Sequence, residues 1–173
     1  MRSVPTDDVI VTGRFTLQPL RVADAQEMVA VLADAGLYAF IGGSPPTLDE
    51  LEARYQRQVA GPGTPGVQWL NWIIRRRDDG RAIGYVQATL SAERDGTVAD
   101  LAWLVGTEFQ GAGAATEATS AVIGQLRARG VDEVRAHIVD GHDASAGVAR
   151  RLGLMPTDEL DAEGERLYVM AAP

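Results

Sequence analysis

The N-terminal part of the chain shows one strand pattern followed by two helical patterns. Residues 14–20 alternate apolar and polar side chains and include a proline, which is typical of an edge strand. Apolar residues then recur at helical spacing from Asp24, and Gly36 is a plausible end of that helix. A second helix is expected to start at Thr47, because Glu50 stands at the capping-box spacing from it.

Strand patterns dominate from Val67 onward. Three β-rich runs are separated by short turns that end in Asp-Gly, at residues 79–80 and 95–96. Asp-Gly between such runs is a strong hairpin signal, so an antiparallel three-stranded meander is expected. Beyond it the pattern predicts a helix from Ala114, a strand over 133–139, a helix over 143–152 that ends at Gly153, and a final strand over 166–170.

The meander leads into a run of small residues at the start of a helix, Gly111-Ala-Gly113-Ala-Ala-Thr116. Glycine permits positive φ and close approach of a ligand, and the first helical turn offers free N–H donors at the positive end of the helix dipole. An anionic ligand is therefore expected here. A dinucleotide site would need a third glycine where Thr116 stands and a parallel βαβ unit, so the context argues against it.

Composition narrows the chemistry. The 173 residues contain no cysteine, two histidines and no lysine, since all sixteen basic residues are arginine. Thiol nucleophiles, thiolate metal sites, Schiff-base lysines and Walker-type loops are thereby excluded, and no metal is expected. The length suits a single domain over residues 1–173.

The net charge of −8 argues against nucleic-acid binding, which needs a basic face. It either favours a cationic substrate or serves solubility, and both interpretations stay open. No apolar run approaches the roughly 20 residues of a membrane span. The N-terminus carries acidic residues where a signal peptide needs basic and apolar ones, so a cytoplasmic protein without membrane or nucleic-acid partners is expected.

The block Gln110-x-x-Gly113-x-Ala115, between a strand and a helix, is similar to the Q/R-x-x-G-x-G/A acyl-CoA signature of the GNAT superfamily of N-acetyltransferases. EFQGAGAATEA and RFTLQPLRVADAQEM resemble segments of the ribosomal-protein alanine N-acetyltransferases of that superfamily, as do GRAIGYVQATL and DASAGVARRLGL. The resemblance follows the family's order over essentially the whole chain.

This resemblance implies a mixed α/β fold whose mostly antiparallel, twisted sheet is splayed between its fourth and fifth strands and flanked by about four helices. It also implies acetyl-CoA as cosubstrate, with its pyrophosphate on the main-chain N–H groups of residues 111–115 and its pantetheine arm along the last of the meander strands. The cosubstrate-binding residues expected on this basis are Leu104, Val105, Gln110, Gly111, Ala112, Gly113, Ala114, Ala115, Thr116, His142 and Ser145.

The chain departs from the family at three positions. Ala112 stands where relatives often carry Lys or Arg, Ala149 where many carry a tyrosine acid, and His142 where they have an asparagine that touches pantetheine. The backbone and the helix dipole must then supply more of the phosphate binding. His142 keeps a hydrogen-bonding side chain and introduces a titrating group.

Direct acetyl transfer needs a base for the amine, a donor for the oxyanion and a proton for the departing thiolate. By resemblance, Asp100 is the candidate base, acting through water, and Glu108 and Glu117 are weaker alternatives. The N–H of Val105 is the oxyanion donor that the resemblance implies, and Ser145 is the acid. An exposed strand carboxylate and a local helix cap are the competing structural roles of Asp100 and Ser145.

The acceptor site is expected over roughly residues 37–72 and in the loop before the last strand, with Tyr38 and Trp72 in contact with the substrate. The acceptor is either a protein N-terminus or a small-molecule amine, and the protein is expected to be a monomer or a homodimer. Two other functions stay open. The missing tyrosine and lysine favour a catalytically silent acyl-CoA-binding regulatory module, and a nicotinamide oxidoreductase is a more distant alternative.

Overall fold

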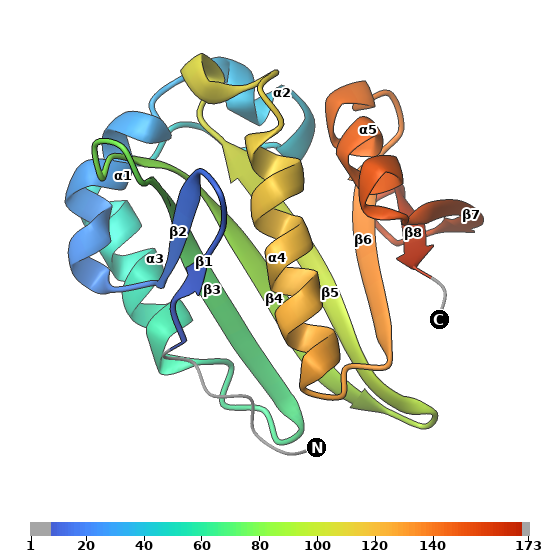
Figure 1. Ribbon diagram of the computed structural model, residues 1–173. Coiled ribbons are helices and arrows are strands. Elements are labelled where there is room, and N and C mark those ends of the chain that lie inside the picture. The colour runs from blue at the N-terminus through green and yellow to red at the C-terminus, as the bar shows by residue number, and fades with distance from the viewer. Residues whose placement is uncertain (1–7, 171–173) are drawn as a thin grey trace.

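A mixed eight-stranded sheet forms the centre of the molecule, in the computed structural model that describes residues 8–170 (Figure 1). The spatial order of the strands is β1-β2-β3-β4-β5-β6-β8-β7, and every neighbouring pair is antiparallel except β5 and β6. The strands are β1 (Ile10–Val11), β2 (Phe15–Pro19), β3 (Val67–Arg76), β4 (Ala82–Glu93), β5 (Gly96–Val105), β6 (Glu133–Val139), β7 (Met155–Leu160) and β8 (Glu165–Met170).

Helices cover both faces of this sheet. Within residues 8–170 they are α1 (Ala25–Val31), α2 (Tyr38–Ile41), α3 (Leu48–Ala60), α4 (Ala114–Ala128) and α5 (Asp143–Leu152), with short 3-10 helices at Val22–Asp24, Ala35–Leu37 and Thr107–Phe109. Apolar residues of α1 and α3 pack on Ile73 of β3 and Leu104 of β5. Apolar residues of α4 pack on the opposite face, because side chains alternate between the faces along each strand.

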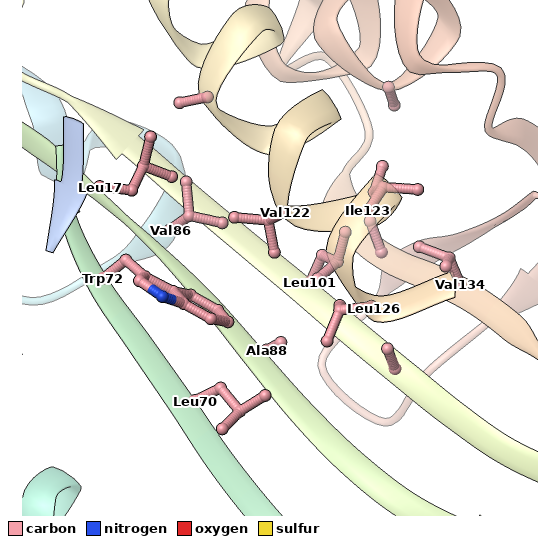
Figure 2. Packing of buried hydrophobic residues seen from close by; sticks show 14 of the residues in the cluster. Leu17, Leu70, Trp72, Val86, Ala88, Leu101, Val122, Ile123, Leu126 and Val134 are labelled. Atoms are coloured by element: carbon pink, nitrogen blue, oxygen red, sulfur yellow. The ribbon is translucent and has the colours of Figure 1, made fainter. Parts of the chain in front are cut away.

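The larger core lies between the sheet and α4 (Figure 2). Leu70 and Trp72 of β3 and Val86 of β4 face Val122 and Leu126 of α4. All five side chains are at most 2% exposed. Complete burial of such side chains contributes roughly 1.5–3 kcal/mol each, so this layer holds α4 against the sheet.

The strand and helix patterns are largely confirmed. The capping box at the start of α3 is present, since the Thr47 hydroxyl accepts the Glu50 N–H (3.3 Å) and the Glu50 carboxylate accepts the Thr47 N–H (2.8 Å). Three short elements were not predicted: β1, α2 and β7. The β7 segment has no apolar alternation and is largely exposed at the sheet edge, so its sequence carries no strand signal.

The only parallel pair of the described sheet opens after three residue pairs. β5 and β6 are matched at Val98 with Glu133, Ala99 with Val134 and Asp100 with Arg135. Beyond Asp100, β5 runs on to Val105 without a partner on this side among the described residues, and the two ribbons diverge (Figure 1). The predicted fold, a mostly antiparallel α/β sheet splayed between these two strands, is confirmed; they are fifth and sixth here because β1 adds a strand.

Gly84 allows β4 to approach β5 closely at the end of the unpaired segment. A Cβ at Gly84 would lie 2.1 Å from the Leu104 carbonyl oxygen and 2.9 Å from the Val105 Cα. Both are main-chain atoms, so no side chain can move to relieve the contact. The position of Val105 therefore depends on a residue without a side chain at Gly84.

We predict that Gly84→Ala lowers the free energy of unfolding by about 1–3 kcal/mol, because overpacking forces the two strands apart. Gly124→Ala is the matched control, since Gly124 lies within α4 and a Cβ there has nothing within 4 Å. That control is expected to stabilise the protein by roughly 0.5–1 kcal/mol through helix propensity. Urea unfolding measures the stability of both variants, and equal stability would contradict the requirement for a residue without a side chain at Gly84.

Candidate active site

The loop between β5 and α4 forms a cradle with exposed main-chain donors. Gly111 (φ 79°) and Gly113 (φ 76°) adopt the left-handed conformation, and no atom lies within 4 Å of a Cβ built at Gly111. In the described part of the chain no acceptor pairs with the N–H groups of Ala114, Ala115 and Thr116, the first turn of α4. The Thr116 hydroxyl is also buried without a partner there. This arrangement suits a phosphate group.

The open edge of β5 supplies one further donor, at Val105. Gly106 N–H donates to the Ile83 carbonyl (2.8 Å), and Gly84 lies opposite Val105 in the register. In an antiparallel ladder this makes Gly84 and Val105 a pair that is not hydrogen-bonded, so the N–H and C=O of Val105 point away from β4. The Gln110 side chain donates to the Val105 carbonyl (2.9 Å), which leaves the Val105 N–H as the free group.

Asp100 is the last residue of β5 that pairs with β6, and it faces the α3 side of the sheet. Its Oδ1 lies 3.6 Å from His137 Nε2, while His137 Nδ1 lies 3.4 Å from Asp161 Oδ2. Burial raises the pKa of the Asp100 carboxyl and Glu93 adds to this, while the charges of His137 and Arg135 lower it; the net pKa is above the usual value. A carboxylate tuned in this direction is a better proton acceptor near neutral pH.

A polar cavity of about 270 Å³ adjoins Asp100 on the α3 face. Gln58 of α3 lines it from the helix side. Asn71 and Gln87 lie on neighbouring strands and are joined by a hydrogen bond of 2.8 Å. The cavity is lined by Gln58, Trp69, Asn71, Gln87, Ala88, Thr89, Asp100 and Ala102. Amides, a hydroxyl and one carboxylate therefore surround a space large enough for a small polar group.

The start of α5 carries a second pair of proton-handling side chains. Ser145 Oγ lies 3.0 Å from His142 Nε2, and the His142 ring stacks on Phe40 of α2 with centroids 4.4 Å apart and planes 12° apart. Burial lowers the pKa of the His142 imidazole and outweighs the opposing charge of Asp143. The imidazole is therefore neutral at pH 7 and can exchange a hydrogen bond with the Ser145 hydroxyl.

Comparison with known proteins identifies the family of the chain. A family model described as acetyltransferase (GNAT) domain matches residues 14–155. The chain belongs to the GNAT acetyltransferase family. The predicted family and enzyme class, an acetyl-CoA-dependent N-acetyltransferase, are thereby confirmed, with acetyl-CoA as cosubstrate. No curated protein matches the sequence of this acetyltransferase at a significant level.

Solved structures agree on the fold. RimL, a ribosomal L7/L12 alpha-N-protein acetyltransferase in complex with coenzyme A, superposes with a TM-score of 0.79 at 15% identity over 95% of this chain and 98% of its own. The microcin C7 self-immunity acetyltransferase MccE, solved with acetyl-CoA and AMP, gives 0.76 at 14% identity over 92% and 93%. A GNAT-family acetyltransferase from Bacillus anthracis gives 0.75 at 13% identity over 95% and 98%.

In this acetyltransferase Arg14 places a cation at the cradle, where Ala112 lacks one. Arg14 Nη1 donates to the Ala112 carbonyl (2.9 Å), and a Cβ at Gly113 would lie 3.6 Å from Arg14 Nη2. Glu117 of α4 holds the arginine, since its carboxylate accepts from the Arg14 N–H (2.9 Å), from Arg14 Nε (2.7 Å) and from the Thr12 hydroxyl (2.7 Å). A residue distant in sequence thus brings a guanidinium to the cradle, where it is ion-paired with Glu117.

The same contacts correct the assignment of Glu117 as an alternative base. Burial raises the pKa of its carboxyl, but the hydrogen bonds from Thr12 and Arg14 outweigh burial and leave the pKa below its usual value. A carboxylate that already accepts three hydrogen bonds and binds its proton weakly is a poor base. Glu117 is an anchor of the cradle. Glu108 pairs with Arg81 (3.2 Å) at an exposed position.

Two further predicted contacts are corrected. Leu104 lies opposite Tyr85 in a hydrogen-bonded pair of the ladder, so its main chain faces β4 and does not offer itself to pantetheine. Trp72 borders a small cavity, but its side chain is 2% exposed and packs in the α4 core, so it is not retained as a substrate contact. Trp69, on the other face of β3, lines the polar cavity instead. The Tyr38 hydroxyl donates to the Leu32 carbonyl (2.9 Å), and its contact with substrate stays a prediction.

His137, Asp161 and Phe40 were missed as site residues. The sequence carried no signal for His137, because its contact with Asp100 depends on the pairing of β5 with β6. Asp161 follows β7, which the sequence did not predict. In residues 8–170 no group of three or more His, Asp or Glu side chains is arranged to hold a metal ion, and no helix there is long and apolar enough to cross a membrane.

We predict that Glu117→Ala weakens acetyl-CoA binding at least about tenfold and lowers the free energy of unfolding by about 0.5–1.5 kcal/mol, because the partly buried Thr12 hydroxyl and the exposed Arg14 donors lose their acceptor. Because the pKa of Glu117 is lowered by folding, its stabilisation is present above the carboxyl's unfolded pKa and is lost as pH falls through the folded one. Calorimetry and urea unfolding measure both effects. Glu108→Ala, at an exposed ion pair, is the matched control and is expected to change neither.

Proposed function

We propose that this acetyltransferase transfers the acetyl group of acetyl-CoA to a primary amine, of a protein N-terminus or a small molecule, by direct attack of the amine on the thioester. The observation that carries the proposal is the position of Asp100. Its carboxylate stands where β5 and β6 part, faces the polar cavity and has His137 beside it. An amine in that cavity would lie next to a base and to the open strand edge.

Main-chain groups would hold acetyl-CoA. The N–H groups of Ala114, Ala115 and Thr116, the left-handed conformation of Gly111 and Gly113, and the guanidinium of Arg14 support binding of the pyrophosphate. The free N–H of Val105 is directed to the open edge of β5. It would donate to the thioester oxygen, whose negative charge grows during attack, and a fixed donor at that place lowers the barrier.

Asp100 would take a proton from the substrate ammonium, directly or through one water, so that the neutral amine can attack the thioester carbon. The pKa of Asp100 is raised mainly by burial, which brings it toward the working pH. The charge of His137 lowers the pKa of Asp100 and so opposes part of that rise. The Nδ1 atom of His137 lies 3.4 Å from the Asp161 carboxylate, which would keep its Nε2 directed toward Asp100. His137 and Asp161 are positioning residues in this scheme, since they act through Asp100.

Ser145 would give a proton or a hydrogen bond to the leaving sulfur. Its partner His142 lies 3.0 Å away and is fixed by the stack on Phe40. Ala149, where many relatives carry a tyrosine, is fully buried and leaves no polar group at that place. Two proton-handling pairs would serve no purpose in a protein that only binds acyl-CoA, which supports a catalytic role over a silent regulatory module.

We predict that Asp100→Asn lowers kcat at least about a hundredfold, because general-base catalysis contributes roughly 10²–10⁴. Acetyl-CoA affinity, on the order of −7 kcal/mol, should be unchanged. Release of CoA thiol with a panel of amines and N-terminal peptides measures the first, and calorimetry the second. Acetyl-CoA binding without turnover of any acceptor would favour the silent module, and absence of binding would contradict both functions.

We predict that the acidic limb of the pH–rate profile reports the ionisation of Asp100. Activity should rise with pH as the carboxyl loses its proton, around a pKa above the usual value for aspartate. His137→Gln removes a positive charge that lowers this pKa, so the limb should move to higher pH while acetyl-CoA binding is retained. An unmoved limb in His137→Gln would show that another group is titrating.

A further inference from the structure

A second, smaller cavity adjoins the polar cavity beneath α3. Its volume is about 90 Å³, whereas one water needs roughly 10–15 Å³. Gln58, Asn71 and Gln87 line both cavities, so the two spaces are neighbours along the sheet. Besides the shared residues, the smaller cavity is lined by the apolar Leu20, Leu32, Trp72 and Ile73 and by Arg54, Tyr55 and Tyr85. The last three differ in kind from the Asp100 end, because they offer hydrogen-bond donors and positive charge.

Tyr55 leaves a buried hydroxyl without a partner. Its side chain is 4% exposed, and its oxygen accepts or donates no hydrogen bond among the described residues. Buried hydroxyls are almost always satisfied, so an unmatched one in a cavity wall indicates a missing ligand group or water. Tyr38 provides the contrast, since its hydroxyl is matched by the Leu32 carbonyl.

Arg54 supplies a positive charge at the smaller cavity, and that charge also acts on the Glu50 carboxylate one turn earlier in α3. The Arg54 side chain is exposed at the mouth of the smaller cavity, and its charge acts on both tyrosines. Burial raises the pKa of Tyr85 to about 12, against the opposing effect of Arg54, and burial likewise raises that of Tyr55. Both phenols are therefore protonated donors at neutral pH.

The one carboxylate that acts on Tyr55 from nearby is already neutralised. Asp24 accepts from Arg75 (2.8 Å) and from the Arg21 N–H (2.8 Å). Its charge is thus balanced by Arg75, which also pairs with Glu27 (2.6 Å). The charge of Arg54 acts on the Glu50 carboxylate, one turn earlier in α3, as well as on the cavity. A guanidinium beside protonated phenols is a donor set that suits a carboxylate.

The distance between the two ends follows from the strand register. Thr89, Gln87 and Tyr85 alternate along one face of β4, and Thr89 lies opposite Asp100. Four residues of strand span about 13 Å. A molecule with its amine near Asp100 therefore reaches the Arg54 end when several bonds separate its two polar groups, with the amides of Asn71 and Gln87 between them.

We infer that the smaller cavity binds a carboxylate of the acceptor, so that the substrate is a primary amine carrying a carboxylate several bonds away. This rests on the proposed acetyl transfer for the identity of the amine end. Arg54 and Tyr55 are then specificity-determining residues. They contact the acceptor at the end remote from the chemistry, and they act on acceptor binding rather than on the acetyl group.

The test compares each acceptor with its uncharged counterpart. γ-Aminobutyrate, ε-aminocaproate and ω-aminocaprylate are each measured against their primary amides by CoA release. At least one acid is expected to exceed its amide about tenfold in kcat/KM. That ratio should fall about tenfold in Arg54→Gln and severalfold in Tyr55→Phe, since charge-assisted bonds are the stronger ones. Arg57→Gln, exposed on the same helix and outside both cavities, is the matched control and should keep the ratio.

Calorimetry with the same acids and amides, in the presence of CoA, separates this inference from the proposed function. If no amine is acetylated but the acid binds to the wild type and not to Arg54→Gln, the proposed function fails and the carboxylate site stands. If acids and amides are acetylated or bound equally well, or if Arg54→Gln leaves the preference intact, the carboxylate site is overturned. If the smaller cavity holds only water, Arg54→Gln leaves the ratio of acid to amide unchanged, and the carboxylate site is overturned.

Discussion

Beyond Asp100, β5 and β6 run on without pairing, and this parting of two parallel strands is the constraint on which the site depends. The main-chain N–H and C=O groups of a strand need hydrogen-bond partners, so an unpaired edge inside a sheet requires a ligand or a side chain to supply them. Here Gln110 satisfies the carbonyl of Val105 and leaves its N–H. The close approach of β4 at Gly84 holds that N–H in place. One strand therefore carries a fixed donor at its end and the Asp100 carboxylate at the point of parting.

The cradle and the polar cavity lie on opposite faces of the sheet. The cradle at the start of α4 belongs to the face that carries the larger core, while the polar cavity lies under α3 on the other face. Arg14, held by Glu117, brings a cation to the loop that lacks one at Ala112. Ser145 with His142 stands in the helix where Ala149 carries no hydroxyl.

The sequence predicted the elements that bury a regular face or carry a cap. Alternation revealed the long strands, and Thr47 with Glu50 marked the start of α3. It did not reveal β7, whose residues are largely exposed, nor which face each tryptophan of β3 takes. Trp69 and Trp72 are three positions apart, so they point to opposite faces of β3. Which face each of them takes is decided only by the register of β3 with β4. The contacts of Asp100 with His137 needed the pairing of β5 with β6, and a single sequence does not fix that pairing.

The most direct test of this account is a crystal structure of the protein with acetyl-CoA or CoA bound. The account predicts the pyrophosphate at hydrogen-bond distance, roughly 2.7–3.2 Å, from main-chain N–H groups of residues 113–116. It also predicts the arm of the ligand along residues 101–105, with the Val105 N–H donating to one of its carbonyl oxygens. A ligand bound on the α3 face alone, or bound with Val105 unused and β5 paired to β6 along its length, would contradict it.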